Sequence, residues 1–213
     1  MCEAVHSIHL KERTESDFDI YHTGTSVKAR VIEVIPAKTS TKETFVDLKI
    51  ENGKVELDKN LDVLKAFVFE RHNNTNKSGF GFIKGFGIKE GALAQTVTHD
   101  AHNLIVVGSN NLDMKIAANE LIKCGGGLVA VKNGKILGKV ELSVAGIMSE
   151  KPIEEMYKLV YNLELAWQQL GCSLPSPFMT MSIIPLACLP ELRLTNRGIV
   201  DCREFKFVSP FVD

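Results

Sequence analysis

The sequence predicts an α+β fold made mainly of antiparallel β-sheets, with two principal α-helices between the sheet layers. Three observations support this class. Short runs of alternating apolar residues recur along the chain, Asn-Gly pairs separate neighbouring runs, and only two segments carry the apolar period of about 3.6 residues that marks a helix. Because the strand-like runs do not alternate regularly with helices, a wound parallel sheet is not expected.

The composition is that of a globular protein and argues against several function classes. The chain has 213 residues, 45% of them hydrophobic and 24% charged, with a formal net charge of −1. Lys and Arg are not clustered, so we expect no nucleic-acid partner. We also expect no membrane partner and a cytoplasmic location, because no apolar run approaches the about 20 residues that cross a bilayer and the start lacks a signal-peptide core. The five cysteines include no C-x-x-C pair, which predicts free thiols.

The pattern divides the chain into three parts. Residues 1–24 carry many charges and three histidines without sustained periodicity, which indicates an extended arm. Residues 25–60 alternate apolar and polar side chains around an Asn52-Gly53 turn and predict a β-meander of the kind that packs on a neighbouring β domain. Residues 61–213 are expected to form the main α+β domain.

Four strand-like features open this domain. Residues 64–70 are almost wholly apolar and predict a buried strand. The segment GFGFIKGFGI at 79–88 alternates glycine with large apolar residues, which lets a strand bend sharply or lets a backbone or ligand approach closely. Its spacing does not match the dinucleotide fingerprint, so nucleotide binding there is not expected. Residues 96–98 favour a strand, and residues 104–107 form a β-branched run.

Two helices are predicted. The first follows a cap at Asn110 or Asn111 and ends at the glycines 125–127. An Asn133-Gly134 hairpin comes next. The second spans about residues 152–170, with an apolar stripe of Met156, Leu159, Val160, Leu163, Ala166, Trp167 and Leu170.

The C-terminal part is punctuated by prolines. Residues 178–201 predict one or two short buried strands that end in a turn at residues 195–198. The final residues indicate an extended tail.

Polar residues that could carry chemistry follow one buried strand and precede another. The candidates are Glu70, Arg71, His72, His99, Asp100, His102 and Asn103. Such a set could transfer protons or bind one metal ion. Equally, His99 and His102 could hydrogen-bond loop backbone, and Glu70 could pair with Arg71 or a lysine. No nucleophile elbow, H-E-x-x-H motif or P-loop is present.

Several blocks together carry a resemblance to a known family. FVFERHNNT, GFGFIKGFGIKEGALAQTVTHDAHNLIVVGSNNLDM and LGCSLPSPFMTMSIIPLACLPELRLTNRGIVD resemble the C-terminal domain of bacterial adenine deaminase, in the amidohydrolase superfamily. The resemblance implies hydrolysis of adenine to hypoxanthine and ammonia. It also implies a water activated by manganese, iron or zinc, held on a barrel domain through an H-x-H pair and further ligands. This sequence has no H-x-H pair, so no metal is expected on this chain, which looks like the C-terminal part alone.

Two loops depart from the family pattern. The family usually reads ERHHGTG and HDSHN, whereas in this chain Asn73 and Asn74 replace His and Gly in the first loop and Ala101 replaces Ser in the second. The seven candidates match the motif position by position. By resemblance they are candidates for lining the mouth of the substrate pocket, with no confident catalytic residue among them.

Three hypotheses follow. In the first, the chain closes the active site of a metal-dependent barrel domain, in the same gene product or on another chain, and mediates assembly. The expected partners are then that barrel, adenine or a related purine, and a second copy of the chain in a homodimer. In the second, it is a stand-alone purine-binding or regulatory protein without catalysis. In the third, His72, His99, Asp100 and His102 build a new metal site.

Overall fold

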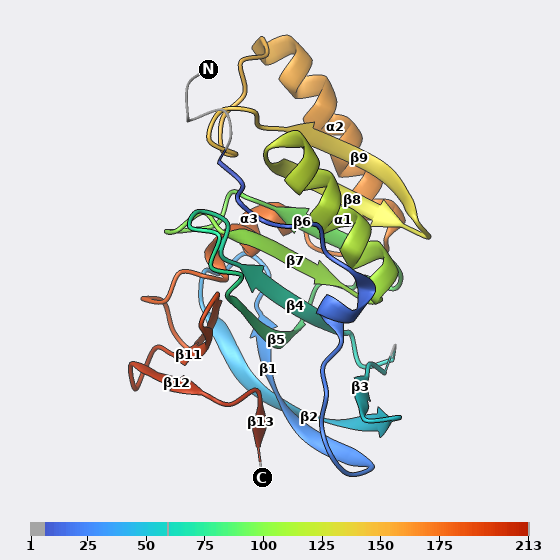
Figure 1. Ribbon diagram of the computed structural model, residues 1–213, viewed down its shortest axis with the longest axis vertical. Coiled ribbons are helices and arrows are strands. Elements are labelled where there is room, and N and C mark those ends of the chain that lie inside the picture. The colour runs from blue at the N-terminus through green and yellow to red at the C-terminus, as the bar shows by residue number, and fades with distance from the viewer. Residues whose placement is uncertain (1–6, 59, 213) are drawn as a thin grey trace.

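The computed structural model describes residues 7–58 and 60–212, and these form one large sheet, one small sheet and three α-helices (Figure 1). The large sheet holds ten strands in the order β3-β2-β1-β5-β4-β7-β6-β8-β9, with β13 also paired to β1. Its strands are β1 (Ser26–Val34), β2 (Thr41–Glu51), β3 (Lys54–Glu56), β4 (Val63–Phe69), β5 (Ser78–Lys84), β6 (Ala92–Gln95), β7 (Leu104–Gly108), β8 (Gly127–Lys132), β9 (Lys135–Glu141) and β13 (Phe211–Val212). The small sheet has the order β10 (Leu192–Thr195), β11 (Gly198–Asp201) and β12 (Lys206–Val208).

The α+β class with mainly antiparallel strands is confirmed, and one strand pair is parallel. All pairs in both sheets are antiparallel except β1 with β5. That pair joins the predicted meander, β1 to β3, to the rest of the sheet through Val31↔Phe82. The meander therefore continues the main sheet, which supplies the additional strands that a small hairpin needs for stability.

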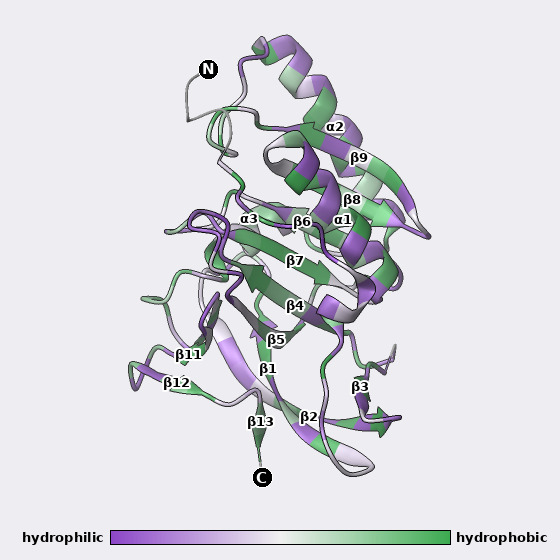
Figure 2. Ribbon diagram, viewed as in Figure 1, coloured by the Kyte–Doolittle hydropathy of each residue, from purple (hydrophilic) through white to green (hydrophobic). Residues whose placement is uncertain are grey.

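The tight turns follow from local sequence. Asn52 and Gly53 have φ of 52° and 77°, and Asn133 and Gly134 have φ of 51° and 76°. These left-handed pairs close the β2–β3 and β8–β9 hairpins, as the Asn-Gly signal predicts. Between these hairpins, β4 is buried along its whole length, and Figure 2 shows it and β7 as almost continuously hydrophobic.

The two long helices lie on opposite faces of the large sheet, and the expected position between two sheet layers is not what the structure shows. On α1 (Asn111–Cys124), Met114, Ala117 and Leu121 pack in one core with β6, β7 and β8. On α2 (Ile153–Gln169), Leu163, Ala166 and Trp167 belong to the core of the other face. A sheet with both faces apolar needs cover on both sides, and the helices divide that task.

The helix boundaries match the predicted signals closely. The side chain of Asn110 accepts a hydrogen bond from the backbone N–H of Asp113 at 2.8 Å, and Gly125 ends α1 with φ of 85°. Along α2 the predicted stripe holds at Leu163, Ala166 and Trp167, but Val160 is exposed on the outer face. None of the helices in the described part of the chain is long and apolar enough to cross a membrane.

The segment before β10 corrects the sequence prediction. Residues Pro177–Ile183 form the helix α3, not a strand, with Pro177 in its first turn. Phe178, Met181 and Ser182 are buried at helical spacing. A short apolar run does not separate helix from strand by periodicity alone, and tertiary packing decided this one. The turn predicted at residues 195–198 is confirmed, since Thr195 pairs with Gly198.

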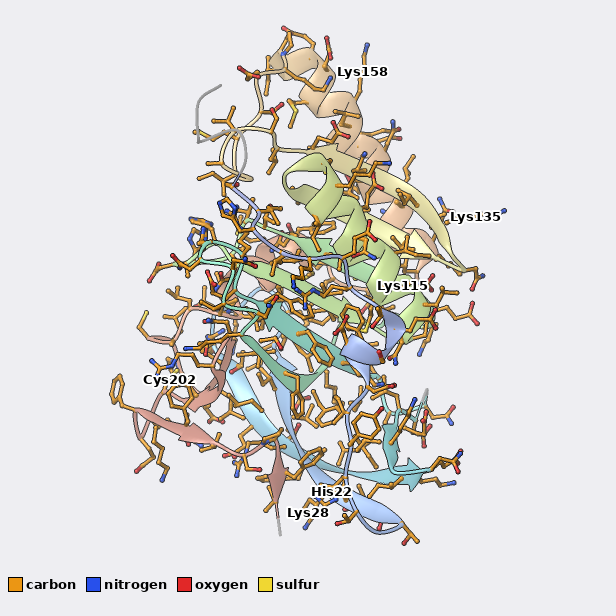
Figure 3. The ribbon with its side chains drawn as sticks, in the orientation of Figure 1. His22, Lys28, Lys115, Lys135, Lys158 and Cys202 are labelled. Atoms are coloured by element: carbon orange, nitrogen blue, oxygen red, sulfur yellow. The ribbon has the colours of Figure 1, made fainter. Side chains whose placement is uncertain are left out.

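The structure describes the N-terminal arm from residue 7 and four of the five cysteines. The arm is extended apart from the 3₁₀ helix η2 (Glu15–Phe18), and the backbone N–H of His9 donates to the carbonyl of Arg71 at 2.7 Å. Cys124, Cys172, Cys188 and Cys202 are free thiols, the last of them directly after β11 (Figure 3). Residues 1–6, which include Cys2, lie outside the described residues.

Candidate functional site

The fold brings the two groups of candidate residues to one end of the large sheet. Phe69, the last residue of β4, is paired with Leu104, the first residue of β7. The segment after β4 therefore lies beside the segment before β7. This places Glu70, Arg71 and His72 next to the loop of residues 98–103, as expected from their positions at strand ends.

Glu70 holds its own loop in shape. Its carboxylate accepts the backbone N–H of His72 at 2.7 Å and of Asn73 at 3.0 Å, and the hydroxyl of Thr75 at 2.7 Å. Burial alone would raise the pKa of Glu70, but these hydrogen bonds prevail and lower it to about 2. The expected pairing of Glu70 with Arg71 or a lysine is wrong, because the backbone of its own loop supplies the partners.

Glu70→Gln is expected to lower the free energy of unfolding by about 2 kcal/mol at pH 7, because an amide replaces a charged acceptor of several hydrogen bonds. The folded pKa lies below the ordinary value of 4.5. The carboxylate therefore stabilises the fold fully above about pH 4.5, and this contribution is lost as the pH falls toward about 2. Urea unfolding at a series of pH values should show the difference between wild type and variant shrinking below about pH 4.5.

Glu12→Gln is the matched control for this prediction, since Glu12 is exposed and makes no side-chain hydrogen bond or ion pair with another described residue. Its effect should stay below about 0.5 kcal/mol at every pH. An effect of Glu70→Gln that does not change with pH would contradict the assigned role of the carboxylate.

Arg71 is a buried tie between three segments that are distant in sequence. Its side chain is 1% exposed. The guanidinium donates from Nη1 to the Ser7 carbonyl and hydroxyl at 3.0 and 2.6 Å, from Nη2 to the Ala145 carbonyl at 2.9 Å, and from Nε to the His102 carbonyl. Burial lowers the pKa of Arg71 to about 10, so it remains charged at neutral pH. No carboxylate pairs with Arg71 among the described residues. Its role is to hold together the arm at Ser7, the loop of residues 98–103 and the loop that contains Ala145.

Three more candidates are also engaged in holding the loops. The Asn103 side chain accepts the backbone N–H of Arg71 at 3.3 Å. The His72 ring lies 2.6 Å from the Ala101 carbonyl through Nε2. The His102 ring accepts the backbone N–H of Thr98 through Nδ1 at 3.2 Å, which requires a neutral ring with its proton on Nε2.

The surroundings of His102 keep it neutral. Burial lowers the pKa of His102, and the neighbouring His99, Arg71 and His72 lower it further, against a smaller opposite effect of Asp100. The prediction that a histidine of this loop bonds loop backbone therefore holds for His102. It does not hold for the ring of His99, whose nearest described ring neighbour is His102 at a centroid distance of 5.4 Å.

His99 and Asp100 are the two candidates whose side chains are left open. Within the described part of the chain, neither side chain makes a hydrogen bond or an ion pair, and both line a cavity of about 90 Å³. Val68 forms the apolar floor of this cavity, and Thr98, Ala101 and Asn103 complete the wall on the side of β7. Typical ligand pockets occupy about 300–1,000 Å³, so this cavity holds only part of a small molecule by itself.

Sequence reasoning missed the opposite wall. Pro185, which follows α3, and the turn residues Thr195 and Asn196 line the same cavity as the loop of residues 98–103. The turn itself was visible in the sequence as Thr-Asn-Arg-Gly, but nothing in the spacing joined it to the histidine loops. Only the packing of the small sheet on the large one makes them neighbours.

The missing side chain of Gly79 lets the turn reach this position. A Cβ atom at Gly79 would lie 2.1 Å from the Thr195 carbonyl oxygen and 2.6 Å from the backbone nitrogen of Gly198. Gly79 is paired with Val68, the floor of the cavity. The alternation of glycine with large residues in β5 therefore serves a close backbone approach, one of its two predicted uses.

The described residues do not build a metal centre. No group of three or more His, Cys, Asp or Glu side chains among residues 7–58 and 60–212 converges in a way that could hold a metal ion. His72 and His102 already use a ring nitrogen on loop backbone. The hypothesis of a new site from His72, His99, Asp100 and His102 thus finds no support in this geometry.

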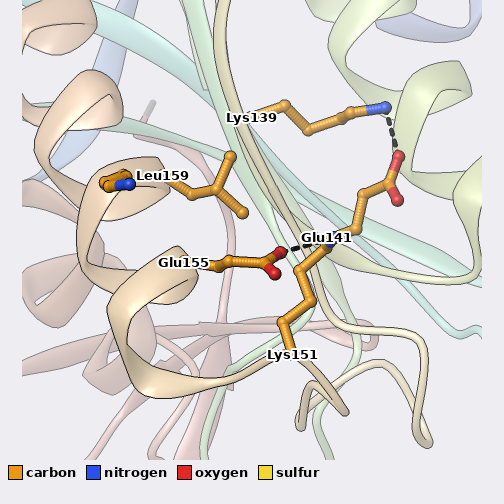
Figure 4. A pocket seen from close by; sticks show the side chains of 6 residues that line it. Lys139, Glu141, Lys151, Glu155 and Leu159 are labelled. Atoms are coloured by element: carbon orange, nitrogen blue, oxygen red, sulfur yellow. Dashed lines mark hydrogen bonds and ion pairs between the residues drawn. The ribbon is translucent and has the colours of Figure 1, made fainter.

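A second pocket, of about 400 Å³, lies between β9 and α2, away from the histidine loops (Figure 4). Its charges largely neutralise one another: Lys139 lies 2.6 Å from the Glu141 carboxylate, and Lys151 lies 3.4 Å from that of Glu155. Partial burial would lower the pKa of Lys139, but ion pairs with Glu120 and Glu141 raise it. The groove thus offers no unpaired buried charge to a ligand.

Comparison with known proteins gives a consistent result. A family model described as "Adenine deaminase C-terminal domain" matches residues 38–206. The chain is 57% identical over 213 residues to a protein named adenine deaminase from Clostridium botulinum (strain Langeland), covering 99% of this chain and 36% of that protein. It is 47% identical over 207 residues to one from Moorella thermoacetica, covering 96% and 35%, and 39% identical over 210 residues to one from Kosmotoga olearia, covering 99% and 36%. The chain thus spans about a third of the length of these curated relatives.

Proposed function

This chain belongs to the adenine deaminase C-terminal domain family, and from that membership we propose that it is the C-terminal part of an adenine deaminase, which converts adenine and water to hypoxanthine and ammonia. The observation that carries the proposal is the identity of 57% to a protein of that name along 99% of this chain. The rest of such an enzyme would be a metal-dependent barrel domain, in the same gene product or on a separate chain.

In this proposal the chain closes one side of the active site. The cavity has a volume of only about 90 Å³, and its open side chains, His99 and Asp100, come from a loop whose other polar side chains are hydrogen-bonded. A rigid loop that presents a few unsatisfied polar groups suits a surface completed by another domain. Glu70, Arg71, His72, His102 and Asn103 then act as the frame that holds this surface.

The metal belongs to the other domain in this proposal. Manganese, iron or zinc would activate the attacking water there. The described residues of this chain offer no converging set of three ligands, so they do not fit such a group. What this chain contributes is enclosure and contacts to the substrate.

A chimera tests the proposal directly. The matching third of the Clostridium botulinum adenine deaminase is replaced by this chain, and ammonia release from adenine is measured with added manganese or iron. We expect activity within about tenfold of the parent, because most of the core packing would be preserved at an identity of 57%. The parent lacking that third, and this chain alone, should both be inactive.

Two outcomes would contradict the proposal. If the chimera is inactive while the parent is active, this chain does not serve as the corresponding part of the enzyme. If the isolated chain deaminates adenine, it is a complete enzyme and the enclosing role is wrong. Binding of adenine to the isolated chain without turnover would favour the stand-alone binding function instead.

We also propose that the outer face of α2 takes part in a homodimer. Ile153, Tyr157, Tyr161 and Leu165 follow one another at four-residue spacing and are 75%, 70%, 50% and 42% exposed. Such a ridge is the element that interlocks when two helices pack with their i±4 rows together. Clusters of exposed large apolar side chains commonly mark interaction surfaces.

The double variant Tyr157→Glu with Tyr161→Glu is expected to halve the mass of the assembled enzyme in analytical ultracentrifugation, because buried carboxylates without partners are strongly unfavourable. Lys158→Glu, on the same turn of α2 and pointing into solvent (Figure 3), is the control and should leave the mass unchanged. A wild-type enzyme that sediments as a monomer would overturn the homodimer.

A further inference from the structure

The cavity beside Val68 is also lined by a polar side chain with no described hydrogen-bond partner that is not among the seven candidate residues. Asn196, in the turn between β10 and β11, lines the same cavity as His99 and Asp100. Its amide makes no hydrogen bond to any other residue within the described ranges. The cavity is therefore lined by an open imidazole and an open carboxylate from the loop of residues 98–103 and by an open amide from the β10–β11 turn.

The turn does not need the Asn196 amide for its own shape. The hydroxyl of Thr195 accepts the backbone N–H of Arg197 at 3.1 Å and donates to the Gly198 carbonyl at 3.1 Å. These two bonds, together with the strand pairing of Thr195 with Gly198, fix the turn. Asn196 is thus free to contact a ligand.

The wall that carries Asn196 is firmly anchored. Arg193 in β10 is fully buried and donates to the carbonyls of Leu189 at 2.9 Å, of Ile183 at 3.2 Å and of Pro190 at 3.2 Å. The turn end of the hairpin, at Thr195 and Gly198, packs closely against Gly79 of β5. A side chain on such a support can hold a defined position relative to a ligand.

We propose that Asn196 is a specificity-determining residue that binds the amidine edge of adenine in the assembled enzyme; this rests on the proposed function. An amide presents an acceptor and a donor side by side, which matches the amino group of adenine beside its ring nitrogen N1. Asn makes the analogous bidentate contact with the amino group and N7 when it reads adenine in DNA. Pro185, which is partly exposed, supplies apolar contact to the flat ring. The small volume of the cavity fits one edge of the base, with the remainder facing the other domain.

Steady-state kinetics of the chimeric enzyme with adenine test this proposal. Asn196→Ala is expected to lower kcat/KM about tenfold to a hundredfold, mostly through KM, because a contact present in both the bound substrate and the transition state is lost. Asn196→Asp separates binding from a structural role. Aspartate suits turns as well as asparagine does, but it lacks the donor, so it should not restore kcat/KM.

Arg197→Ala is the matched control, since Arg197 is the next residue of the same turn and does not line the cavity. Its kcat/KM should stay within about twofold of the unsubstituted chimera. Thermal unfolding of all variants shows that they remain folded.

Each outcome decides one question. An active chimera whose kcat/KM is unchanged by Asn196→Ala, or is restored by Asn196→Asp, overturns the role of Asn196 and leaves the proposed function standing. An inactive unsubstituted chimera beside an active parent overturns the proposed function, and the role of Asn196 with it. Loss in both Asn196 variants, with Arg197→Ala active, supports the proposal.

Discussion

Gly79→Ala is expected to lower the free energy of unfolding by about 3 kcal/mol or more and to displace the small sheet from the large one. The added Cβ would stand 2.1 Å from the Thr195 carbonyl oxygen and 2.6 Å from the Gly198 backbone nitrogen. Backbone atoms in a paired hairpin cannot move aside singly, so the whole turn must shift. Urea unfolding measures the loss, and hydrogen exchange at the amides of β10 and β11 measures the displacement.

Gly81→Ala is the matched control, two residues further along the same face of β5. A Cβ there would meet side-chain atoms only, the nearest being Ile199 Cδ1 at 3.2 Å and Cγ1 at 3.3 Å. Side chains can adjust by a few tenths of an ångström, so the cost should stay below about 1 kcal/mol. Equal effects of the two substitutions would show that the close approach at Gly79 does not set the position of the turn.

The two variants Gly79→Ala and Gly81→Ala also test whether the position of the turn affects activity. In the chimeric enzyme, Gly79→Ala moves the wall that carries Asn196, whereas Gly81→Ala leaves it in place. A fall in kcat/KM with the first substitution and not the second is therefore expected even at temperatures where both proteins are folded.

Arg71→Met is expected to lower the free energy of unfolding by about 3 kcal/mol. The methionine keeps most of the apolar volume but leaves the carbonyls of Ser7, His102 and Ala145 without their donor. The substitution also removes a buried cation that has no carboxylate partner, and the desolvation cost of that cation is then no longer paid. This effect favours the variant. The loss should prevail, because each buried carbonyl left unsatisfied costs about 1–3 kcal/mol.

Urea unfolding provides the measurement for Arg71→Met, and hydrogen exchange at the amide of His9, which is bonded to the Arg71 carbonyl, reports release of the arm. Arg197→Met is the control, since Arg197 is exposed and contacts the Phe207 ring at 5.1 Å. Its cost should be below about 1 kcal/mol. A variant at Arg71 as stable as this control would contradict the role of the guanidinium as a tie between three segments.

Local signals in the sequence sufficed for much of the fold. The Asn-Gly pairs at residues 52–53 and 133–134 specify left-handed turns, and the cap at Asn110 and the glycine at 125 set the ends of α1. Each signal acts within a few residues, so it can be recognised without knowing what the segment packs against. The same holds for β4, whose apolar run, interrupted only by Lys65, indicates burial on both faces.

α3 shows where such signals are insufficient. Residues 177–183 are apolar and short, and both helix and strand are consistent with them. What selects the helix is contact with the large sheet, where Phe178 and Met181 join the core shared with α2. The parallel pairing of β1 with β5 is likewise a contact between segments far apart in the sequence, and no turn residue predicts it.

The candidate site, too, was predictable from the sequence only in part. The sequence by itself determined that polar residues stand at two strand ends and, through the family resemblance, which of them match the motif. Only the tertiary structure decided which of these side chains have hydrogen-bond partners within the chain and which do not. Glu70 is satisfied by its own loop, Arg71 by residues 64 and 74 positions away, and His99 and Asp100 by nothing in the described chain. Asn196 joins them because a glycine at residue 79 lets a distant turn pack against the sheet, a contact between segments far apart in the sequence, which local patterns do not encode.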